Sequence, residues 1–492
     1  MMTTAPTTLL NVAKVFTSPG AEAPLGPQRL HLKQGRIAAL EPLAHINGAA
    51  MHHVVLPAPS NAHDHGRGLR TLAFGARDQS LETWLPELAY EPQVDPYLRA
   101  AVAFARMAEG GIAAANHCHN TQDGRALLKE ARGVARAARD VGVRIAFAVP
   151  FAGLNSVVYG DLDPLLQRLP HTDHARIRAQ RVPTRSSDEN FALVEAIAEL
   201  EHEGFTVQYG PVGPQWVDDD TLARIAQASA DSGRRVHMHL FETQRQRAWA
   251  DARYPGGLLR HLDALGLLSP RLTVAHAVWL DADDCALLAE RGVTLSANVS
   301  SNLRLRSGVA PWSHYLDSGV RFGFGLDGMS LDDDDDILRE TRLAWHLLAA
   351  SDRRGRFAHA DLFRALCVDG RRSVLGDDGG GTLRVGAPAD LLVLDTRRLT
   401  RDRIADDRPA LLDLIIGRAT RRDISQLVVA GRTVVDNGHC CSVDLPSLEA
   451  ELIAQAKQAA RDNPPDADAI GRLHAAVRAH YGCACTGHED DR

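Results

Sequence analysis

The feature that most restricts the fold of this 492-residue chain is a regular alternation of strand-like and helix-like segments through its middle. Amphipathic stretches, for example 96–109, 124–140, 188–202 and 218–231, separate short strand-like runs. The predicted strands span 112–118, 143–150, 205–210, 235–240, 272–276, 293–298 and 321–326. With a strand leading to His63 this makes eight in roughly 290 residues, which predicts a (β/α)8 barrel of the α/β class.

The two ends of the chain show a different pattern. Short strands with glycine and proline turns are predicted at 9–16, 30–32, 37–40 and 54–56, and again at 390–394 and 425–435. We expect one small β-sandwich built from both ends, with residues 1–57 and 376–442 around a barrel of residues 58–375. Residues 443–492 form a tail with helices predicted at 448–461 and 468–480.

Composition narrows the class of protein. The hydrophobic and charged fractions, 45% and 24%, are ordinary for a soluble globular chain. A net charge of -7 argues against nucleic-acid binding. Seven cysteines, an odd number, indicate reduced thiols, and no leader peptide or apolar membrane-spanning stretch is predicted. We expect a cytoplasmic protein. The Cys/His-containing end at 480–488 lacks the two separated ligand pairs of structural zinc and is expected to be a flexible terminus.

Polar residues with metal-binding side chains recur at the ends of the predicted barrel strands. The apolar run 54–56 leads through two prolines to His63 and His65, whose i, i+2 spacing points both imidazoles to one side. His239 and Glu242, then His276, then Asp327 follow at three later strand ends. Each alone is better explained as a packed histidine or a helix-capping aspartate. Their shared position at the mouth of a barrel predicts one metal site.

Imidazoles and a carboxylate suit zinc, iron or another first-row divalent ion. Water on such an ion loses a proton near neutral pH, which gives a metal-bound hydroxide. A nearby carboxylic acid could then shuttle protons, and a further histidine could orient the nucleophile.

Segments 56–66, 239–243, 274–276, 300–303 and 325–328 resemble the amidohydrolase superfamily, in its cytosine-deaminase and chlorohydrolase-like branch. The resemblance continues into the flanking strands at 386–391 and 429–432. It implies four metal ligands, His63, His65, His239 and Asp327. It also implies that Glu242 moves a proton to the leaving nitrogen and that His276 positions or polarises the water. Asp327 would take the proton of the water first.

Two details bear on the number of metal ions. His237 also points inward, but the family spacing places the ligand three residues before Glu242, which selects His239 and leaves His237 as a packed barrel-layer residue. Binuclear relatives bridge two ions with a carboxylated lysine. The only lysines are Lys14, Lys33, Lys129 and Lys457, so strands three to eight offer none and one ion is expected.

Candidates for substrate contact lie in loops at the same mouth: Arg67, Arg70, His117, His119, Gln215, Trp216 and Asn302. His117 and His119 could instead hold a second metal, although no bridging carboxylate is evident. Trp216 could equally be a packed loop anchor. The acidic run 332–336 could trap a cation, but we favour the first turn of a helix, where the macrodipole stabilises acids.

These observations predict a metal-dependent hydrolase that removes ammonia or a small amine from an amino-substituted C=N substrate, with zinc expected first and iron or manganese as alternatives. Plausible substrates are purine, pyrimidine, pterin or triazine-like rings, or a formimidoyl group. Opening of a cyclic amide, as in imidazolone-hydrolysing relatives, is the chemical alternative. A barrel that binds without catalysis is the other. We expect a small-molecule substrate and a homodimer or higher homo-oligomer.

Overall fold

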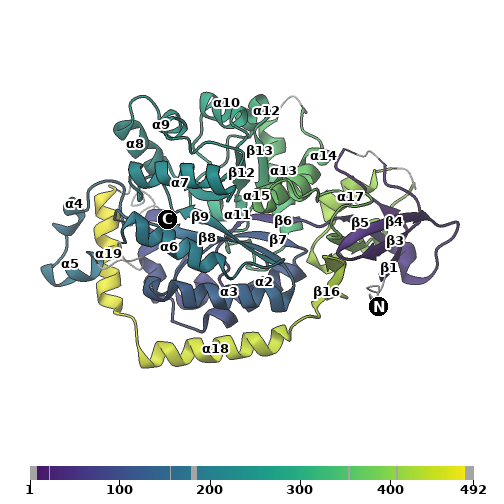
Figure 1. The fold of residues 1–492 in the computed structure, drawn as a ribbon, viewed down its shortest axis with the longest axis horizontal. Helices are drawn as coiled ribbons and strands as arrows, with labels where there is room; N and C mark the ends of the chain where they lie inside the picture. Colours follow the sequence, from purple (N-terminus) through teal and green to yellow (C-terminus); the bar gives the residue numbers. More distant parts are fainter. Residues whose placement is uncertain are drawn as a thin grey trace, which may run out of the picture.

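The computed structural model describes residues 8–20, 23–155, 157–178, 185–352, 355–405 and 408–482. Its centre is an eight-stranded parallel sheet in which each strand pairs with the next along the chain (Figure 1). This confirms the predicted (β/α)8 barrel. The strands are β6 (Ser60–Asp64), β7 (Ala114–Cys118), β8 (Arg144–Phe151), β9 (Phe205–Pro211), β10 (Val236–Leu240), β11 (Leu272–His276), β12 (Thr294–Ala297) and β13 (Arg321–Phe324).

The first barrel strand is separate from the apolar run 54–56, which the sequence analysis placed in the sandwich. Val54–Leu56 belongs to β5 (His53–Pro57), which lies in a different sheet, and His63 lies on a strand of its own, β6. Pro59 lies between the two strands, where it has no N–H to offer to a ladder. The backbone N–H of Asp327, just after β13, donates to the carbonyl of His63 at 3.0 Å and joins the last strand to the first.

Helices cover the outside of the barrel. The principal ones are α2 (Pro96–Glu109), α3 (Leu127–Val141), α6 (Ser187–Ala198), α7 (Asp219–Ser232), α8 (Gln244–Arg253), α9 (Leu258–Ala264), α10 (Ala282–Glu290), α12 (Trp312–Ser318) and α13 (Ile337–Ser351). Their apolar faces join the strands in one large core. A short helix, α15 (Gly370–Leu375), closes the opposite end from the loops that follow the strands. There the carbonyl of Ser373 accepts hydrogen bonds from Asn116, Arg235 and Thr273.

The acidic run before α13 corrects a prediction. Only Asp336 takes part in the start of the helix, as its N-cap, and its carboxylate accepts from the N–H groups of Leu338 and Arg339. The four preceding aspartates lie in turns, where three of them have positive φ. Arginines form ion pairs with the run. Arg339 pairs with Asp332 and Asp334, and Arg70 pairs with Asp335. Ion pairing outweighs the macrodipole here because the arginines reach the carboxylates directly.

A β-sandwich from both chain ends lies beside the barrel, on the right in Figure 1. One sheet has the order β1-β3-β4 and the other β17-β16-β15-β14-β5-β2. Their bounds are β1 (Thr8–Val12), β2 (Lys14–Val15), β3 (Gln28–Lys33), β4 (Arg36–Pro42), β14 (Leu391–Asp395), β15 (Ile424–Val429), β16 (Arg432–Asp436) and β17 (His439–Cys440).

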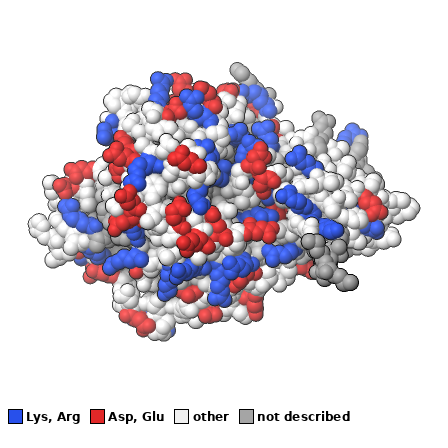
Figure 2. Space-filling model, viewed as in Figure 1, with Lys and Arg blue, Asp and Glu red and all other residues white. Residues whose placement is uncertain are grey.

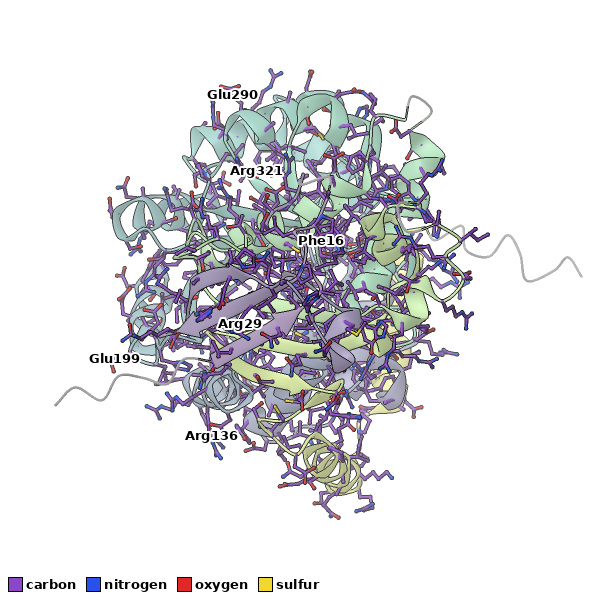
Figure 3. All side chains as sticks on the ribbon, turned by 90° about the vertical axis from the view of Figure 1, so that its right-hand side faces the viewer. Phe16, Arg29, Arg136, Glu199, Glu290 and Arg321 are labelled. Carbon is purple, nitrogen blue, oxygen red and sulfur yellow. The ribbon has the colours of Figure 1, made fainter. Side chains whose placement is uncertain are left out.

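The strand β14 shows why the sandwich stays attached to the barrel. Leu391 and Val393 pack into the sandwich core, whereas the alternate residues Leu392 and Leu394 join the barrel core. Phe16 extends this contact, with its ring 5.8 Å from that of Phe363 on α14 (His359–Arg364). Figure 3, seen from this end, shows Phe16 within the molecule and Arg136, Glu199 and Glu290 toward its outside.

The tail forms two helices, α18 (Leu445–Asp462) and α19 (Ala467–His480), shown in yellow in Figure 1. The first packs on α2, and the second lies against α1 (Leu81–Trp84), η3 (Leu85–Tyr90) and α4 (Asp163–Leu166). The cysteines and the histidine at 483–488, for which a flexible terminus was predicted, lie outside the described residues.

Acidic and basic side chains alternate over the face shown in Figure 2. In the part of the chain that the structure describes, no helix has both the length and the apolar character needed to cross a membrane. The described cysteines, Cys118, Cys285, Cys367, Cys440 and Cys441, are free thiols.

Candidate active site

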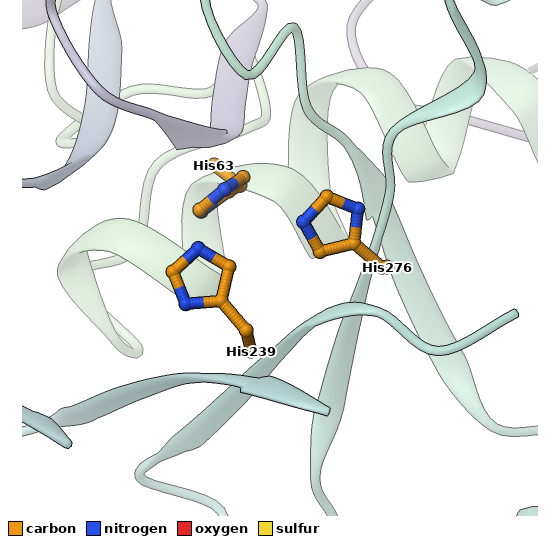
Figure 4. A group of neighbouring side chains, drawn as sticks. All are labelled: His63, His239 and His276. Atoms are coloured by element: carbon orange, nitrogen blue, oxygen red, sulfur yellow. The ribbon is translucent and has the colours of Figure 1, made fainter. Parts of the chain in front are cut away.

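The predicted metal-binding residues meet at the ends of four barrel strands. The ligand atoms of His63, His65 and Asp327 lie within 4.8 Å of one another, and so do those of His63, His239 and His276. Figure 4 shows the rings of His63, His239 and His276 turned toward a common space. The Nε2 atoms of His63 and His65 are each 3.1 Å from Oδ1 of Asp327. The geometry admits His276 as a further ligand.

Each imidazole makes a hydrogen bond through its Nδ1 atom, on the side of the ring away from the cluster. The carbonyls of Cys118 and Val212 accept from His65 and His239 at 2.8 and 2.7 Å. A carbonyl can only accept, so Nδ1 carries the proton and Nε2 of the neutral ring has a free lone pair. Burial lowers the pKa of His65 to about 4 and that of His239 to about 3, so both are neutral at pH 7.

His63 is oriented by a residue that we predicted to be only a packed barrel-layer side chain. Its Nδ1 atom lies 2.7 Å from Nε2 of His237, and the two rings stack with centroids 4.9 Å apart. Both residues are fully buried, and burial lowers the pKa of His63 to about 4. The alternation of β10 predicts that His237 points inward. The direct hydrogen bond to a ligand on another strand has no signal in the sequence.

The residues present fit a divalent cation. Nε2 of His63 and Oδ1 of Asp327 are buried and have no hydrogen-bond partner in the described structure. Ser301 donates to the other carboxylate oxygen of Asp327, Oδ2, at 2.5 Å, which leaves Oδ1 facing the histidines. Lone pairs of neutral imidazoles and a carboxylate oxygen thus converge, and such an arrangement calls for a cation between them.

Glu242 and His276 lie beside this cluster. An oxygen of Glu242 is 3.5 Å from Nε2 of His276, and the other accepts from Ser307 at 3.2 Å. Burial raises the pKa of Glu242 to about 7. The Nδ1 atom of His276 lies 2.9 Å from Oδ1 of Asn302. A carboxyl group with a pKa near neutrality can both take up and release a proton in the working pH range.

These groups open into one cavity of about 130 Å³, which suits a small molecule. Its polar part contains His65, His239, Glu242, His276, Asp327, Arg67, Asn120, Gln215 and Gln246. Its remaining walls come from Leu81, Trp84, Leu85, Leu88, Tyr159, Val212, Trp216 and Leu305. A second cavity, between α18 and the residues that precede α2, is lined mainly by apolar side chains and Lys457 and offers no acid–base pair.

Three predicted substrate residues, Arg67, Gln215 and Trp216, line the cavity. Gln215 is fixed by Gln246, whose amide donates to it at 2.6 Å. The ring of Trp216 stacks near that of Tyr159, with centroids 6.3 Å apart, so Trp216 both packs in its loop and faces the cavity.

The other four predicted substrate residues point elsewhere, which corrects the expectation of direct contact. Arg70 makes two hydrogen bonds to Asp335, at 3.0 and 2.7 Å. His117 contacts His119 at 3.0 Å, and His119 in turn contacts Glu130 at 2.7 Å. These three line a separate, much smaller space. His117 on β7, His119 just after it and Glu130 on α3 thus form one buried hydrogen-bonded row.

Asn302, the fourth, acts on His276 and does not line the cavity. The sequence analysis missed Trp84 and Tyr159, which do line it. Trp84 ends the four-residue helix α1, and Tyr159 lies in an irregular segment before α4; neither stretch is long enough or regular enough for a periodic pattern to mark the residues that face inward.

Backbone conformation marks the same region. Phe241, His276 and Asp327 have φ of 49°, 72° and 58°, in the left-handed region that residues other than glycine seldom adopt. All three lie at or just after the ends of β10, β11 and β13. Such strain persists where surrounding contacts impose it and is concentrated at functional sites.

Comparison with known proteins agrees with this geometry. Residues 54–434 match the amidohydrolase family, and the chain belongs to this family. It is 28% identical over 239 residues to a 5-methylthioadenosine/S-adenosylhomocysteine deaminase of Bacillus cereus strain B4264, a match that covers 49% of this chain and 54% of the relative. The corresponding deaminase of Bacillus thuringiensis strain Al Hakam matches with the same identity and coverage. The matches thus span about half the length of these curated relatives.

Solved structures resemble the whole fold. An adenosine deaminase from Xanthomonas campestris with bound zinc gives a TM-score of 0.77 at 22% identity and covers 92% of this chain and 98% of its own. An atrazine chlorohydrolase variant from Arthrobacter aurescens TC1, complexed with zinc and atraton, gives 0.76 at 22% identity, with coverages of 91% and 99%. At these identities the likeness establishes the fold.

Proposed function

We propose that the protein is a metal-dependent aminohydrolase, which removes ammonia or a small amine from an amino-substituted, heterocyclic C=N substrate. The observation that carries this proposal is the convergence of an unpartnered histidine–aspartate cluster and the Glu242–His276 pair in one cavity. The names of the sequence relatives support deamination over the opening of a cyclic amide.

His63, His65, His239 and Asp327 would hold one divalent cation, with zinc expected before iron or manganese. Zinc in two similar structures supports that choice. When bound, the cation supplies Lewis acidity, which lowers the pKa of a water molecule and polarises the substrate. Asp327 would accept the first proton of the water at Oδ1, the oxygen that Ser301 leaves free.

The remaining residues handle the leaving group. Glu242, protonated, would donate its proton to the leaving nitrogen, while Nε2 of His276 would hold the attacking water in line. The C–O bond forms first and the C–N bond then breaks. One proton of the water ends on the ring nitrogen, and the other replaces the proton that Glu242 gives to the leaving nitrogen, so the products are a carbonyl compound and ammonia or an amine. Leu81, Trp84 and Leu305 keep bulk water away from the reacting atoms.

Release of ammonia from a panel of amino-heterocycles and formimidoyl compounds tests this function, together with metal analysis of the purified protein. We expect about one zinc per chain and ammonia release that is lost in Asp327→Asn. Asp283→Asn, exposed on α10, serves as the control. If the purified protein contains no metal and stays inert after zinc, iron or manganese is added, the proposal is wrong and the barrel binds its ligand without catalysis. New carboxylate without ammonia would indicate ring opening.

The compartment and the assembly state remain predictions from the sequence. We propose a cytoplasmic enzyme that forms a homodimer or higher homo-oligomer and acts on a small molecule. Size-exclusion chromatography with light scattering tests the assembly state.

A further inference from the structure

The cavity contains a buried arginine that no contact described above explains. Arg67 follows His65 by two residues, lines the cavity and is 3% exposed. Its Nε and Nη1 atoms are buried, and among the described residues none accepts a hydrogen bond from either of these two atoms. The Trp84 ring, 5.5 Å from the guanidinium carbon, covers it without supplying an acceptor.

The carboxylates whose charges act on Arg67 are those of Glu91, Asp327 and Asp64, and each contacts other groups through at least one oxygen. Glu91 accepts from Nε and Nη2 of Arg99 at 3.1 and 2.8 Å. Asp64 accepts from two backbone N–H groups and one amide side chain. Asp327 faces the histidines. The positive charge of Arg67 therefore lies among acids, but its Nε and Nη1 atoms are bonded to none of them.

The loop that carries Arg67 is closely packed on both sides. A Cβ atom at Gly66, whose φ is 58°, would lie 2.4 Å from the ring of His117. A Cβ atom at Gly68 would lie 2.4 Å from the carbonyl oxygen of Arg99. These glycines let the backbone approach its neighbours, so the start of the Arg67 side chain is held in place before any ligand binds.

An arginine stays charged at any working pH, and a buried charge without a partner destabilises the fold. A planar carboxylate is the group that best pairs with a guanidinium, because it accepts two parallel N–H bonds. We propose that Arg67 binds a carboxylate group of the substrate, so that the substrates are amino-substituted compounds that also carry a carboxylate. This inference rests on the proposed function, since it places the carboxylate on the molecule that loses ammonia.

Isothermal titration with a matched pair of probes tests the inference. The pair is 2-aminopyrimidine-5-carboxylate and its neutral carboxamide, each titrated into the full chain. We expect the carboxylate to bind about tenfold tighter or more. In Arg67→Met the two should bind alike, at the affinity of the carboxamide, and in Arg67→Lys the preference should be smaller than in the natural chain. Arg77→Met, exposed in the same loop, should keep the full preference.

Equal binding of the two probes, no binding of the carboxylate, or a preference that survives in Arg67→Met would each overturn the inference. Thermal unfolding provides a second readout. Because Nε and Nη1 of Arg67 have no acceptor, Arg67→Met should raise Tm, whereas Arg99→Met, which removes the partner of Glu91, should lower it. A drop in Tm for Arg67→Met as large as that for Arg99→Met would show that Arg67 is structural.

Ammonia release separates this inference from the proposed function. Carboxylate binding through Arg67 without ammonia from any amine in the panel would contradict the aminohydrolase and leave the Arg67 site intact. Ammonia release at equal rates from carboxylate and carboxamide substrates would support the aminohydrolase and contradict the Arg67 site.

Discussion

At the scale of single residues, the site depends on how side chains are held as much as on which ones are present. Each Nδ1 atom of the converging histidines has a fixed neighbour, so the Nε2 atoms face one point. Second contacts of this kind set both the tautomer and the ring orientation. Glu242 has a different environment, where burial raises its pKa to about 7. Two predictions belong to this scale.

The first concerns pH. If Glu242 gives its proton to the leaving nitrogen, kcat/KM should fall as pH rises through about 7, because the raised pKa leaves the acid form available only below that value. In Glu242→Gln we expect kcat to fall by about 10²–10⁴-fold and this limb of the pH profile to disappear. Initial rates between pH 5 and 9 provide the measurement. A limb that persists in the variant would assign the titration to another group.

The second concerns His237. Replacing it with alanine removes the partner of His63 Nδ1 and frees that ring to rotate. We expect zinc affinity to fall by about 10–100-fold, measured by competition with a chromophoric chelator. His31→Ala, in the sandwich at some distance from the cluster, is the control. An unchanged zinc affinity in His237→Ala would mean that His237 has only the packing role predicted from the sequence.

At the scale of elements, the tail helix α19 connects two segments that wall the cavity. It packs against α1, which contributes Trp84, and against α4, in the segment that contributes Tyr159. Tyr481, just after α19, accepts a hydrogen bond from the backbone N–H of Tyr159 at 2.9 Å. The guanidinium of Arg245 lies 5.3 Å from its ring. The position of this wall therefore depends on the last described turn of the chain.

Tyr481→Phe should loosen the wall without touching the reacting groups. Loss of one hydrogen bond, about 1 kcal/mol, predicts a KM roughly fivefold higher with little change in kcat. Tyr97→Phe, a surface tyrosine that stacks on Arg136, should leave both constants unchanged. Steady-state kinetics provide the measurement. A roughly fivefold fall in kcat would instead mean that the wall also positions the catalytic groups.

The sequence predicts an element well where the periodicity of its residues determines the structure. It predicts poorly where contacts between residues far apart in the chain determine the position of a side chain. The eight strands, the principal helices and the converging histidines all follow repeats of two or 3.6 residues, so they were predictable. Arg70 was assigned to the cavity because its position in a loop says nothing about Asp335, which is 265 residues away in the chain. The acidic run was placed in a helix because local rules count the macrodipole and cannot count Arg70 and Arg304, which reach Asp335 and Asp333 from distant parts of the chain.

At the scale of the whole molecule, Asp390 joins the barrel to the sandwich. It is 4% exposed and lies 2.8 Å from Arg144 of β8 and 2.7 Å from Arg371 of α15. Its other oxygen accepts from the backbone N–H of Ala430 at 2.6 Å. Burial alone would raise the pKa of Asp390, but the two arginines hold it below its ordinary value.

Asp390→Ala leaves two arginines without their shared partner at a buried junction. We expect the free energy of unfolding to fall by about 3–5 kcal/mol, measured by urea denaturation. In the natural chain this contribution is complete above the ordinary aspartate pKa of about 4 and is lost as pH falls through the lower pKa of the folded state. Asp395→Ala, at the exposed end of β14, should cost well under 1 kcal/mol. Similar losses in the two variants would contradict this role.

Metal removal also belongs to this scale, because the proposed ligands lie at the ends of three strands, β6, β10 and β13, and a cation would join them. Chelation should lower Tm, and zinc at about 100 times its Kd should restore about 2.7 kcal/mol of stability. Differential scanning calorimetry of the chelated and reloaded protein measures both. A Tm that does not respond to zinc would argue against ligands from separate strands.

The pairing of β14 with β5 also has a consequence for the order in which the chain is synthesised and folds. Its partner β5 is made early, and about 330 residues must be added before Leu391 can pair with Pro57. At about 5–20 residues per second, β5 and the apolar faces of Val54 and Leu56 wait roughly 15–70 s on the ribosome for their neighbour. The strand that carries His63 waits almost as long for β13. A nascent chain of this protein therefore exposes this apolar strand edge during most of its own synthesis, and its yield in cells should depend on the chaperones that bind it there.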